Sequence, residues 1–200
     1  MSLLVSFTSL NKEVIISRIP IALLISIVVI LVSVFAKKIT ARKIDVKIQH
    51  KIFEWERYWW SKGSHFKKPI PMGIIFPLLL LVLSAGFVKF FAFFEFKSEA
   101  LVSKAVKKYG RYRFSNMNEW DDALIGFYGL LAILALGIIT RFIPSIIFPF
   151  NELAKYSIYY AICNMIPLAN LDGVKIFFGS RPLYILSLVL LALAAIIVFI

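Results

Sequence analysis

The sequence is poor in the side chains that cross-link a fold or bind transition metals. It contains one cysteine, Cys163, so it cannot form an internal disulfide, and its thiol content does not indicate a cellular compartment. Cys163 lies in an apolar run, which is typical of a small core residue rather than a reactive thiol. The only histidines are His50 and His65, so few imidazoles are available as metal ligands. No internal repeat or low-complexity linker divides the chain, which favours a single membrane domain over residues 1–200.

Acidic side chains are also few. Eleven Asp and Glu residues stand against 23 Lys and Arg residues, which gives a formal net charge of +12. Residues 36–68 carry ten basic and three acidic side chains, a net charge of 10 − 3 = +7. In a soluble protein such an excess would suggest nucleic acid as a partner. Between membrane spans it indicates the cytoplasmic side and contact with anionic lipid headgroups, so we expect no nucleic-acid partner.

Apolar residues dominate the composition. Hydrophobic residues make up 60% of the chain and the mean hydropathy is +0.86, whereas an ordinary soluble domain is about 45–50% apolar. Two runs carry no charge, one of 17 residues (19–35) and one of 19 residues (182–200). Each approaches the roughly 20 residues that cross a bilayer. Lys37 and Lys38 follow the first run where a signal peptide would have small residues, so we predict a retained span.

We therefore predict an all-α integral membrane protein with four or five transmembrane helices. The expected spans are residues 19–36, 73–94, 123–140, 153–169 and 182–200. Aromatic side chains alternate with charges in residues 37–68, which predicts an interfacial helix and loop. Residues 95–122 are predicted to form a polar loop. Its last acidic side chains, Glu119, Asp121 and Asp122, are expected at the N-terminus of the third span, where the helix dipole favours negative charge.

The most informative segment runs from Asn164 to Gly173, because it places Asp172 in an apolar, membrane-length setting. A carboxylate at membrane depth is costly unless it is paired, hydrated or bound to a cation, so it marks a functional site. A plainer alternative is a turn between two spans, in which Asp172 caps the following backbone. We expect Asp172 to accept hydrogen bonds from backbone amides near Gly173 or to pair with Lys175 or Arg181.

The segment from Cys163 to Tyr184 resembles the C-terminal motif of the site-2 proteases, which are intramembrane zinc metalloproteases, in particular their small prokaryotic and archaeal forms. The matching residues are Asn164, Pro167, Leu171, Asp172, Gly173, Lys175, Arg181 and Pro182. The resemblance implies a helical membrane fold with a catalytic zinc ion. It also implies that two histidines spaced i, i+4 on one helix bind zinc together with the Asp, and that a Glu beside the first His is the general base.

The chain departs from this pattern because it contains no His-Glu-x-x-His. The best counterpart is the stretch from Val46 to His50, in which Val46 stands for the first His and Lys47 for the catalytic Glu. A charged lysine cannot accept a proton and would repel zinc. His50 and Asp172 then remain as candidate ligands. A rebuilt site, with Glu54 spaced i, i+4 from His50, is the alternative. His65 has no helical partner at metal spacing and is interpreted as interfacial.

These departures favour a non-catalytic, site-2-protease-like protein that binds membrane segments of other proteins and the lipids around it. No catalytic residue and no cofactor are expected on this interpretation. Two alternatives stay open. One is an active intramembrane zinc metalloprotease with altered ligands, and the other is a membrane scaffold or small transport subunit unrelated to proteolysis. The resemblance further implies the cell membrane of a prokaryote.

Overall fold

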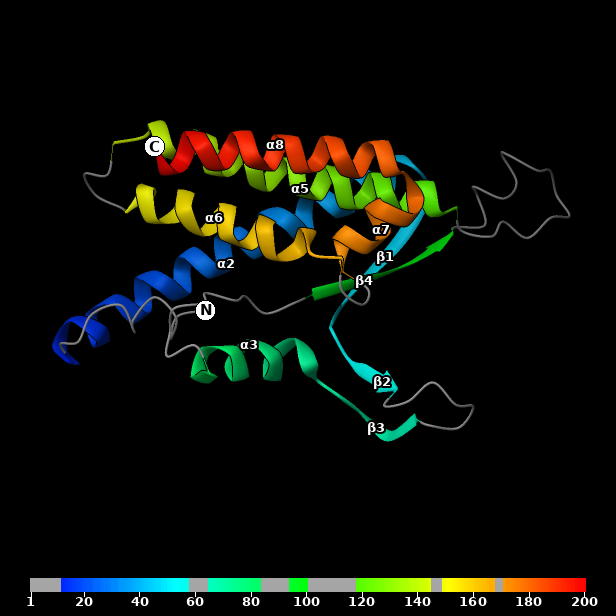
Figure 1. The fold of residues 1–200 in the computed structure, drawn as a ribbon, viewed down its shortest axis with the longest axis horizontal. Coiled ribbons are helices and arrows are strands. Elements are labelled where there is room, and N and C mark those ends of the chain that lie inside the picture. Colours follow the sequence, from blue (N-terminus) through cyan, green and yellow to red (C-terminus); the bar gives the residue numbers. More distant parts are fainter. Residues whose placement is uncertain (1–11, 58–64, 84–93, 101–117, 145–148, 168–170) are drawn as a thin grey trace, which may run out of the picture.

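The computed structural model describes residues 12–57, 65–83, 94–100, 118–144, 149–167 and 171–200. This part of the chain is mostly helical. The helices are α2 (Lys12–Lys43), α3 (Met72–Leu83), α5 (Glu119–Phe142), α6 (Phe150–Met165), α7 (Asp172–Gly179) and α8 (Arg181–Phe199). The strands are β1 (Val46–Ile52), β2 (Trp55–Arg57), β3 (His65–Ile70) and β4 (Phe94–Ala100). Figure 1 shows α2, α5, α6 and α8 stacked in one bundle, with α7 and the pair β1–β4 at one end.

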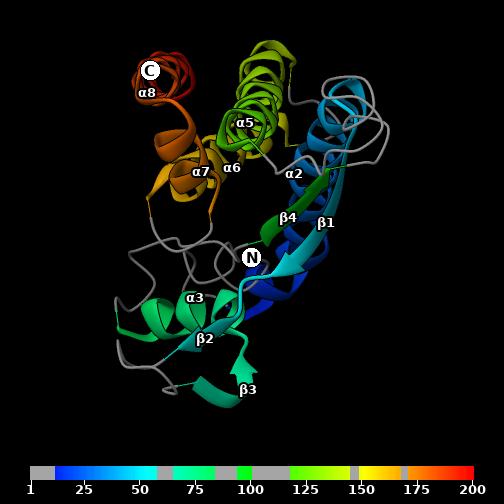
Figure 2. The ribbon, with the colours of Figure 1, turned by 90° about the vertical axis from the view of Figure 1, so that its right-hand side faces the viewer.

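Helix α5 is the centre of the bundle and packs on α2, α6, α7 and α8. The view along the helices shows α5 between α8 and α2 (Figure 2). Its sequence suits this position because it is apolar on several faces and carries small residues where neighbours approach. Gly126 lies against α7 and Gly137 lies against α6, where an added Cβ would stand 3.2 Å from Ile176 and Ile158 respectively. Small residues of this kind let helices pack closely in membrane bundles.

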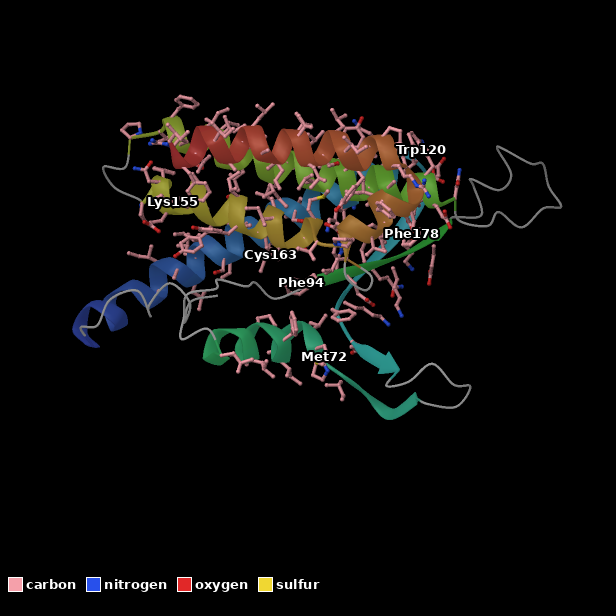
Figure 3. The ribbon with its side chains drawn as sticks, viewed as in Figure 1. Met72, Phe94, Trp120, Lys155, Cys163 and Phe178 are labelled. Carbon is pink, nitrogen blue, oxygen red and sulfur yellow. The ribbon has the colours of Figure 1, made fainter. Side chains whose placement is uncertain are left out.

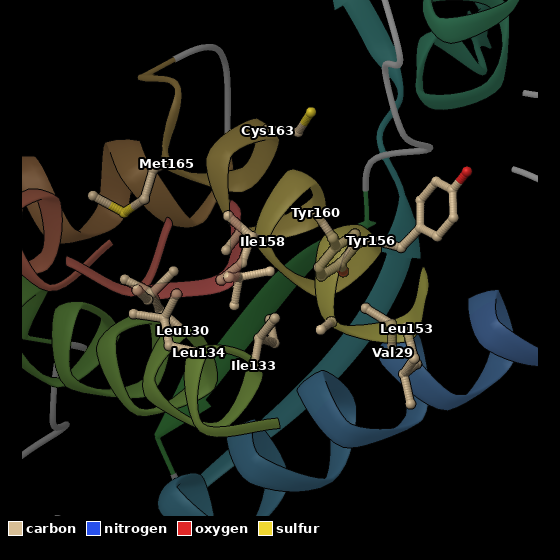
Figure 4. Close-up of a cluster of buried hydrophobic side chains, with 14 of the residues drawn as sticks. Val29, Leu130, Ile133, Leu134, Leu153, Tyr156, Ile158, Tyr160, Cys163 and Met165 are labelled. Carbon is tan, nitrogen blue, oxygen red and sulfur yellow. The ribbon is translucent and has the colours of Figure 1, made fainter. Parts of the chain in front are cut away.

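The hydrophobic core lies between α2, α5, α6 and α8, and Figure 4 shows its central part. Val29 of α2, Leu134 of α5 and Ile158 of α6 are among its buried side chains. Cys163 is buried in the same cluster, which confirms its interpretation as a core residue. Because these side chains come from helices far apart in the sequence, the core fixes the positions of α2 and α6 relative to each other.

Among the described residues, three helices are long and apolar enough to cross a membrane: Pro20–Lys43, Glu119–Phe142 and Arg181–Phe199. They contain three of the five expected spans, residues 19–36, 123–140 and 182–200, apart from a residue at the ends. The expected span 153–169 corresponds to α6, which has 16 residues and ends before Pro167. The expected span 73–94 begins in α3, but its residues 84–93 lie outside the described part of the chain.

Two small antiparallel sheets correct the prediction of an all-α fold. Helix α2 extends to Lys43, and the remainder of the expected interfacial helix contains β1, β2 and β3 instead, with residues 58–64 outside the description. The expected polar loop begins with β4, which pairs with β1 from Val46↔Ala100 to Ile52↔Phe94. The turn between α2 and β1 contains Asp45 at a φ of 53°, a left-handed conformation that Asp tolerates better than most residues.

The start of α5 follows the sequence prediction. Asn118 is its N-cap, and the side chain accepts a hydrogen bond from the backbone N–H of Trp120. Glu119, Asp121 and Asp122 lie in the first turn. Their negative charges are favourable there because the N-terminal end of the helix dipole is positive. The prediction that these acidic residues begin a helix is therefore confirmed.

Candidate functional site

The described residues of the motif, 164–167 and 171–173, lie at the end of α6 and at the start of α7, and residues 168–170 are outside the description. Asn164 is buried near the end of α6, and Leu171 is the buried N-cap of α7. Gly173 approaches the end of α6 so closely that a Cβ would lie 2.3 Å from the carbonyl oxygen of Met165. The hydroxyl of Tyr184, on α8, donates a hydrogen bond to the same carbonyl at 3.3 Å. The junction therefore holds α6, α7 and α8 together and fixes the first residue of α7, Asp172.

Asp172 forms a buried ion pair with Lys37 of α2. The Nζ of Lys37 lies 2.6 Å from Oδ2 of Asp172, and the two side chains are 2% and 4% exposed. This corrects the expected partners, because neither Lys175 nor Arg181 forms this ion pair. Two charges buried this deeply are stable only together, since removing either leaves the other uncompensated. The pair joins α2 to α7 across the end of the bundle.

The aliphatic part of Lys37 crosses α5 at Gly129. A Cβ at Gly129 would lie 2.7 Å from Cε and 2.8 Å from Cγ of Lys37, so a larger residue would displace the Lys37 side chain from this position. The ammonium group also lies 5.3 Å from the centroid of the Phe96 ring, on β4. A cation over an aromatic face gains electrostatic stabilisation, most of all when it is desolvated. The Lys37 ammonium group is therefore stabilised by both the Asp172 carboxylate and the Phe96 ring.

His50 lies directly opposite Phe96 in the β1–β4 pairing, so their side chains share one face of the sheet. Its Nε2 is buried and has no hydrogen-bond partner. Burial and, after it, the nearby Lys37 ammonium lower the pKa of His50 to about 4, while Asp172 acts in the opposite direction. At neutral pH the imidazole is therefore uncharged. The charges of Asp172 and Lys37 both act on His50, and Lys37 forms the ion pair with Asp172.

Lys175 also lies at the Phe96 ring, without an ion pair to Asp172. Its Nζ donates a hydrogen bond to the carbonyl oxygen of Phe96 and lies 3.3 Å from the centroid of the ring. Burial lowers the pKa of Lys175, whereas the carboxylates of Asp122 and Asp172 raise it. Lys175 thus ties α7 to β4. The neighbouring motif residues Arg181 and Pro182 form the first turn of α8, which the Ser180 side chain caps.

Several buried polar atoms near this ion pair have no hydrogen-bond partner. They include Oγ of Ser33, Nε2 of His50, Nδ2 of Asn164 and Oδ1 of Asp172. Each such atom costs roughly 1–3 kcal/mol unless a bound molecule or water satisfies it. We refer to Ser33, Lys37, His50, Asn164 and Asp172 as the Lys37–Asp172 centre. It combines donors and acceptors in a buried position.

The sequence-based register for a metal helix is wrong. Val46 to His50 belongs to strand β1, so residues spaced i, i+4 do not meet as they do on a helix. Val46 is buried in a small apolar cluster with Phe96, and Lys47 is exposed opposite Glu99. Glu54 is exposed between β1 and β2, which also removes the helical His50–Glu54 pair. His65 lies at the start of β3.

Sequence reasoning missed Lys37, and helical periodicity contains the signal that would have found it. The buried side chains of α2 form one stripe: Ala22, Ile25, Ser26, Val29, Ser33, Lys37 and Ala41. Steps of three and four residues keep all of them on one face. Lys37 continues this stripe whereas Lys38 is exposed, so the two lysines that follow the first apolar run have different environments.

The pH dependence of stability should reflect the neutral state of His50. Its folded pKa of about 4 is below the reference value of 6.5, so the unfolded chain binds more protons between these values. Stability is then lost as the pH falls from about 6.5 to about 4. Allowing for the solvent screening of a half-buried side chain, we expect a cost of about 1 kcal/mol, or about 2–4 °C in apparent melting temperature. Thermal unfolding in detergent at pH 7.5 and pH 5, compared with His50→Gln, measures it. An equal drop in both proteins would contradict the assignment.

Comparison with known proteins gives no relative to which the centre can be matched. The chain matches no protein-family model, no curated protein and no solved structure. Within the described residues, no group of three or more His, Cys, Asp or Glu side chains is placed to hold a metal ion. The geometry of the Lys37–Asp172 centre is therefore the basis on which function is inferred.

Proposed function

We propose that this chain is a site-2-protease-like membrane protein that binds transmembrane segments of other proteins without cleaving them. The motif from Asn164 to Pro182 supports the family resemblance. The observation that carries the proposal is the buried contact between Lys37 and Asp172. The resemblance makes Asp172 a zinc ligand, but here the ammonium group of Lys37 neutralises its carboxylate.

The residues of the centre do not fit a zinc ion. Catalytic zinc takes three protein ligands and a water molecule. Here one oxygen of Asp172 contacts an ammonium group, and a cation within a few ångströms repels a metal ion in a buried setting. The described residues also supply no third His, Cys, Asp or Glu near Asp172. The charges at the centre therefore disfavour peptide hydrolysis by a metal ion bound to Asp172.

The exterior of the bundle supports insertion in a membrane. Large apolar side chains are exposed along α2 and α8, among them Leu24, Leu31, Ile185 and Val189. A soluble monomer rarely exposes apolar surface on this scale, whereas a bilayer covers it. Trp120 and Phe178 are exposed at the α7 end of the bundle, and Lys155 lies toward the other end (Figure 3). Aromatic side chains in such positions favour the headgroup level. The cell membrane of a prokaryote is the proposed location.

Binding is favoured over an inert scaffold because the centre has unused hydrogen-bonding capacity. The Nδ2 of Asn164 is a donor and Oδ1 of Asp172 is an acceptor, and both are buried without partners. The backbone of a transmembrane segment that is locally not helical presents the complementary carbonyl and N–H groups. In a low-dielectric setting such groups need partners. Because the bundle encloses both atoms, the segment binds them only where α6 and α7 part at their junction.

Metal content and cleavage test the non-catalytic part of the proposal. We expect the purified full chain in detergent to contain well below one zinc atom per chain by mass spectrometry. We also expect it to leave a fluorescent transmembrane peptide uncut, with and without added zinc. The reason is that Lys37 holds the carboxylate that a metal would need. One zinc atom per chain together with chelator-sensitive cleavage would instead establish the active protease.

Peptide affinity tests the binding part. In nanodiscs, the wild-type chain should bind a labelled transmembrane peptide with a central glycine-proline break, measured by fluorescence anisotropy. Asn164→Leu removes one hydrogen bond and should weaken binding about tenfold. Ser157→Ala is the matched control, because its buried hydroxyl already donates to the carbonyl of Leu153. Equal affinities for all three proteins, or no binding by the wild type, would favour the scaffold alternative.

A further inference from the structure

Glu95, on strand β4, is a second carboxylate buried at the α7 end of the bundle. Its side chain is 5% exposed, and its Oε2 has no hydrogen-bond partner. The residue opposite Glu95 in β1 is Lys51, whose side chain is exposed, and no ion pair joins the two in the described part of the chain. A buried carboxylate without a cation of its own is costly, and such a group marks a functional site in a membrane protein.

The Lys175 ammonium lies close to Glu95 but does not compensate its charge. Its Nζ donates a hydrogen bond to the carbonyl oxygen of Phe96, the residue after Glu95, and lies over the Phe96 ring. Burial lowers the pKa of Lys175, and three carboxylates act against this effect. The larger contributions come from Asp122 and Asp172, and the smallest comes from Glu95. Of the three carboxylates, Glu95 is therefore the one that the Lys175 charge stabilises least.

The charged side chains that act on Lys175, together with Lys175 itself, do not balance. They are three carboxylates and two ammonium groups: Asp122, Asp172, Glu95, Lys37 and Lys175. Their formal charge is 2 − 3 = −1. One oxygen of each carboxylate is buried without a hydrogen-bond partner, so the group lacks N–H donors as well as positive charge. An ammonium or guanidinium group supplies both at once.

We infer that Glu95 binds the basic side chain of a lysine or arginine in the membrane segment that this chain recognises. This role of Glu95 rests on the proposed function and names the class of segment that is bound. Asn164 and Asp172 contact the non-helical backbone of the segment, and Glu95 contacts a basic residue beyond it. The position suits such a residue, because Trp120 and Phe178 are exposed at the same end of the bundle and indicate the headgroup level (Figure 3).

Peptide binding to the full chain in nanodiscs measures this contact. Two labelled transmembrane peptides share a central glycine-proline break and differ at one position after it, where one has lysine and the other has norleucine. Norleucine keeps the aliphatic stem and lacks the ammonium group. A series of such pairs moves the position along the peptide. At the best position the wild type should bind the lysine peptide about tenfold more tightly, because a hydrogen bond between charged groups forms.

Glu95→Gln should bind both peptides with the affinity that the wild type has for the norleucine peptide. Glu99→Gln is the matched control, because Glu99 lies on the same face of β4 but is exposed, and it should keep the full preference for lysine. Glu95→Gln should unfold at the same temperature as the wild type or a higher one, because it removes an uncompensated charge. If this variant does not fold, a third peptide with glutamate at the same position decides, and the wild type should bind it more weakly than the norleucine peptide.

The lipid distinguishes a basic side chain of the segment from the amine of a lipid headgroup. Phosphatidylglycerol nanodiscs contain no lipid amine, and replacing half of this lipid by phosphatidylethanolamine should leave the preference for lysine unchanged. Loss of the preference would assign Glu95 to the lipid headgroup and overturn the inference. Equal affinities for the lysine and norleucine peptides, or a preference that Glu95→Gln retains, would also overturn it. Absence of binding by every peptide would overturn the proposed function as well, so the two failures are distinguishable.

Discussion

Replacing Lys37 by methionine should destabilise the protein by about 3–5 kcal/mol. The substitution keeps an unbranched side chain over Gly129 but leaves the Asp172 carboxylate buried without its cation. The double variant Lys37→Met/Asp172→Leu removes both charges and should recover most of the loss, since a buried pair is often replaceable by apolar residues. Asp172→Asn should cost less than Asp172→Leu alone, because the amide oxygen still accepts a hydrogen bond from the ammonium.

Unfolding in detergent, followed by circular dichroism against temperature or added denaturing detergent, measures this double-mutant cycle. Lys38→Met is the matched control, because the neighbouring lysine is exposed and its loss should change stability by less than about 0.5 kcal/mol. Strictly additive effects of the Lys37 and Asp172 substitutions would show that the two side chains do not interact in the folded protein.

The second large effect is expected from Gly173→Val. At this position even a Cβ would lie 2.3 Å from the Met165 carbonyl oxygen and 2.6 Å from its carbon. Both atoms belong to the backbone, so they yield only if α6 and α7 separate. Overpacking against side chains costs about 1–3 kcal/mol, and a clash with backbone should reach or exceed the upper end of that range. The apparent melting temperature should fall by roughly 6–12 °C or more.

Gly126→Ala is the control for this prediction. Its added Cβ would meet the side chain of Ile176 at 3.2 Å, which a rotamer change accommodates, so we expect a loss below about 1.5 kcal/mol. Gly173→Val should also weaken peptide binding, because separating α6 from α7 moves Asn164 away from Asp172. If Gly173→Val unfolds at the same temperature as Gly126→Ala, the close contact between α7 and Met165 does not exist.

Part of the fold was predictable from the sequence because uninterrupted apolar runs and charged helix starts act locally. The three long apolar helices and the acidic first turn of α5 follow from such signals. The sheets were missed although residues 46–52 alternate between apolar and polar side chains, with Val46, Ile48 and Ile52 on one face and Lys47, Gln49 and Lys51 on the other. That period of two indicates a strand. Residues at the i, i+4 spacing of a helix therefore do not meet in this segment, because it is a strand.

Of the two residues in the buried ion pair, only Asp172 was predictable from the sequence. Asp172 was singled out because a lone carboxylate in an apolar run needs a partner. Its partner was assigned to nearby residues of the sequence, Lys175 or Arg181, whereas the structure brings in Lys37 from helix α2, 172 − 37 = 135 residues earlier in the chain. No local pattern specifies a contact between segments so distant. The information lies in tertiary packing, in particular in the space that Gly129 leaves for the lysine stem.

The ion pair also constrains the order in which the protein is assembled. Lys37 and Asp172 are 172 − 37 = 135 residues apart, and a nascent chain emerges from its N-terminus. Helix α2 is complete long before α7 has been translated, and until then the Lys37 ammonium has no carboxylate to meet. It must wait in contact with water or headgroups, where a lysine side chain is stable. The ion pair that joins α2 to α7 therefore forms only after the chain has been synthesised as far as Asp172.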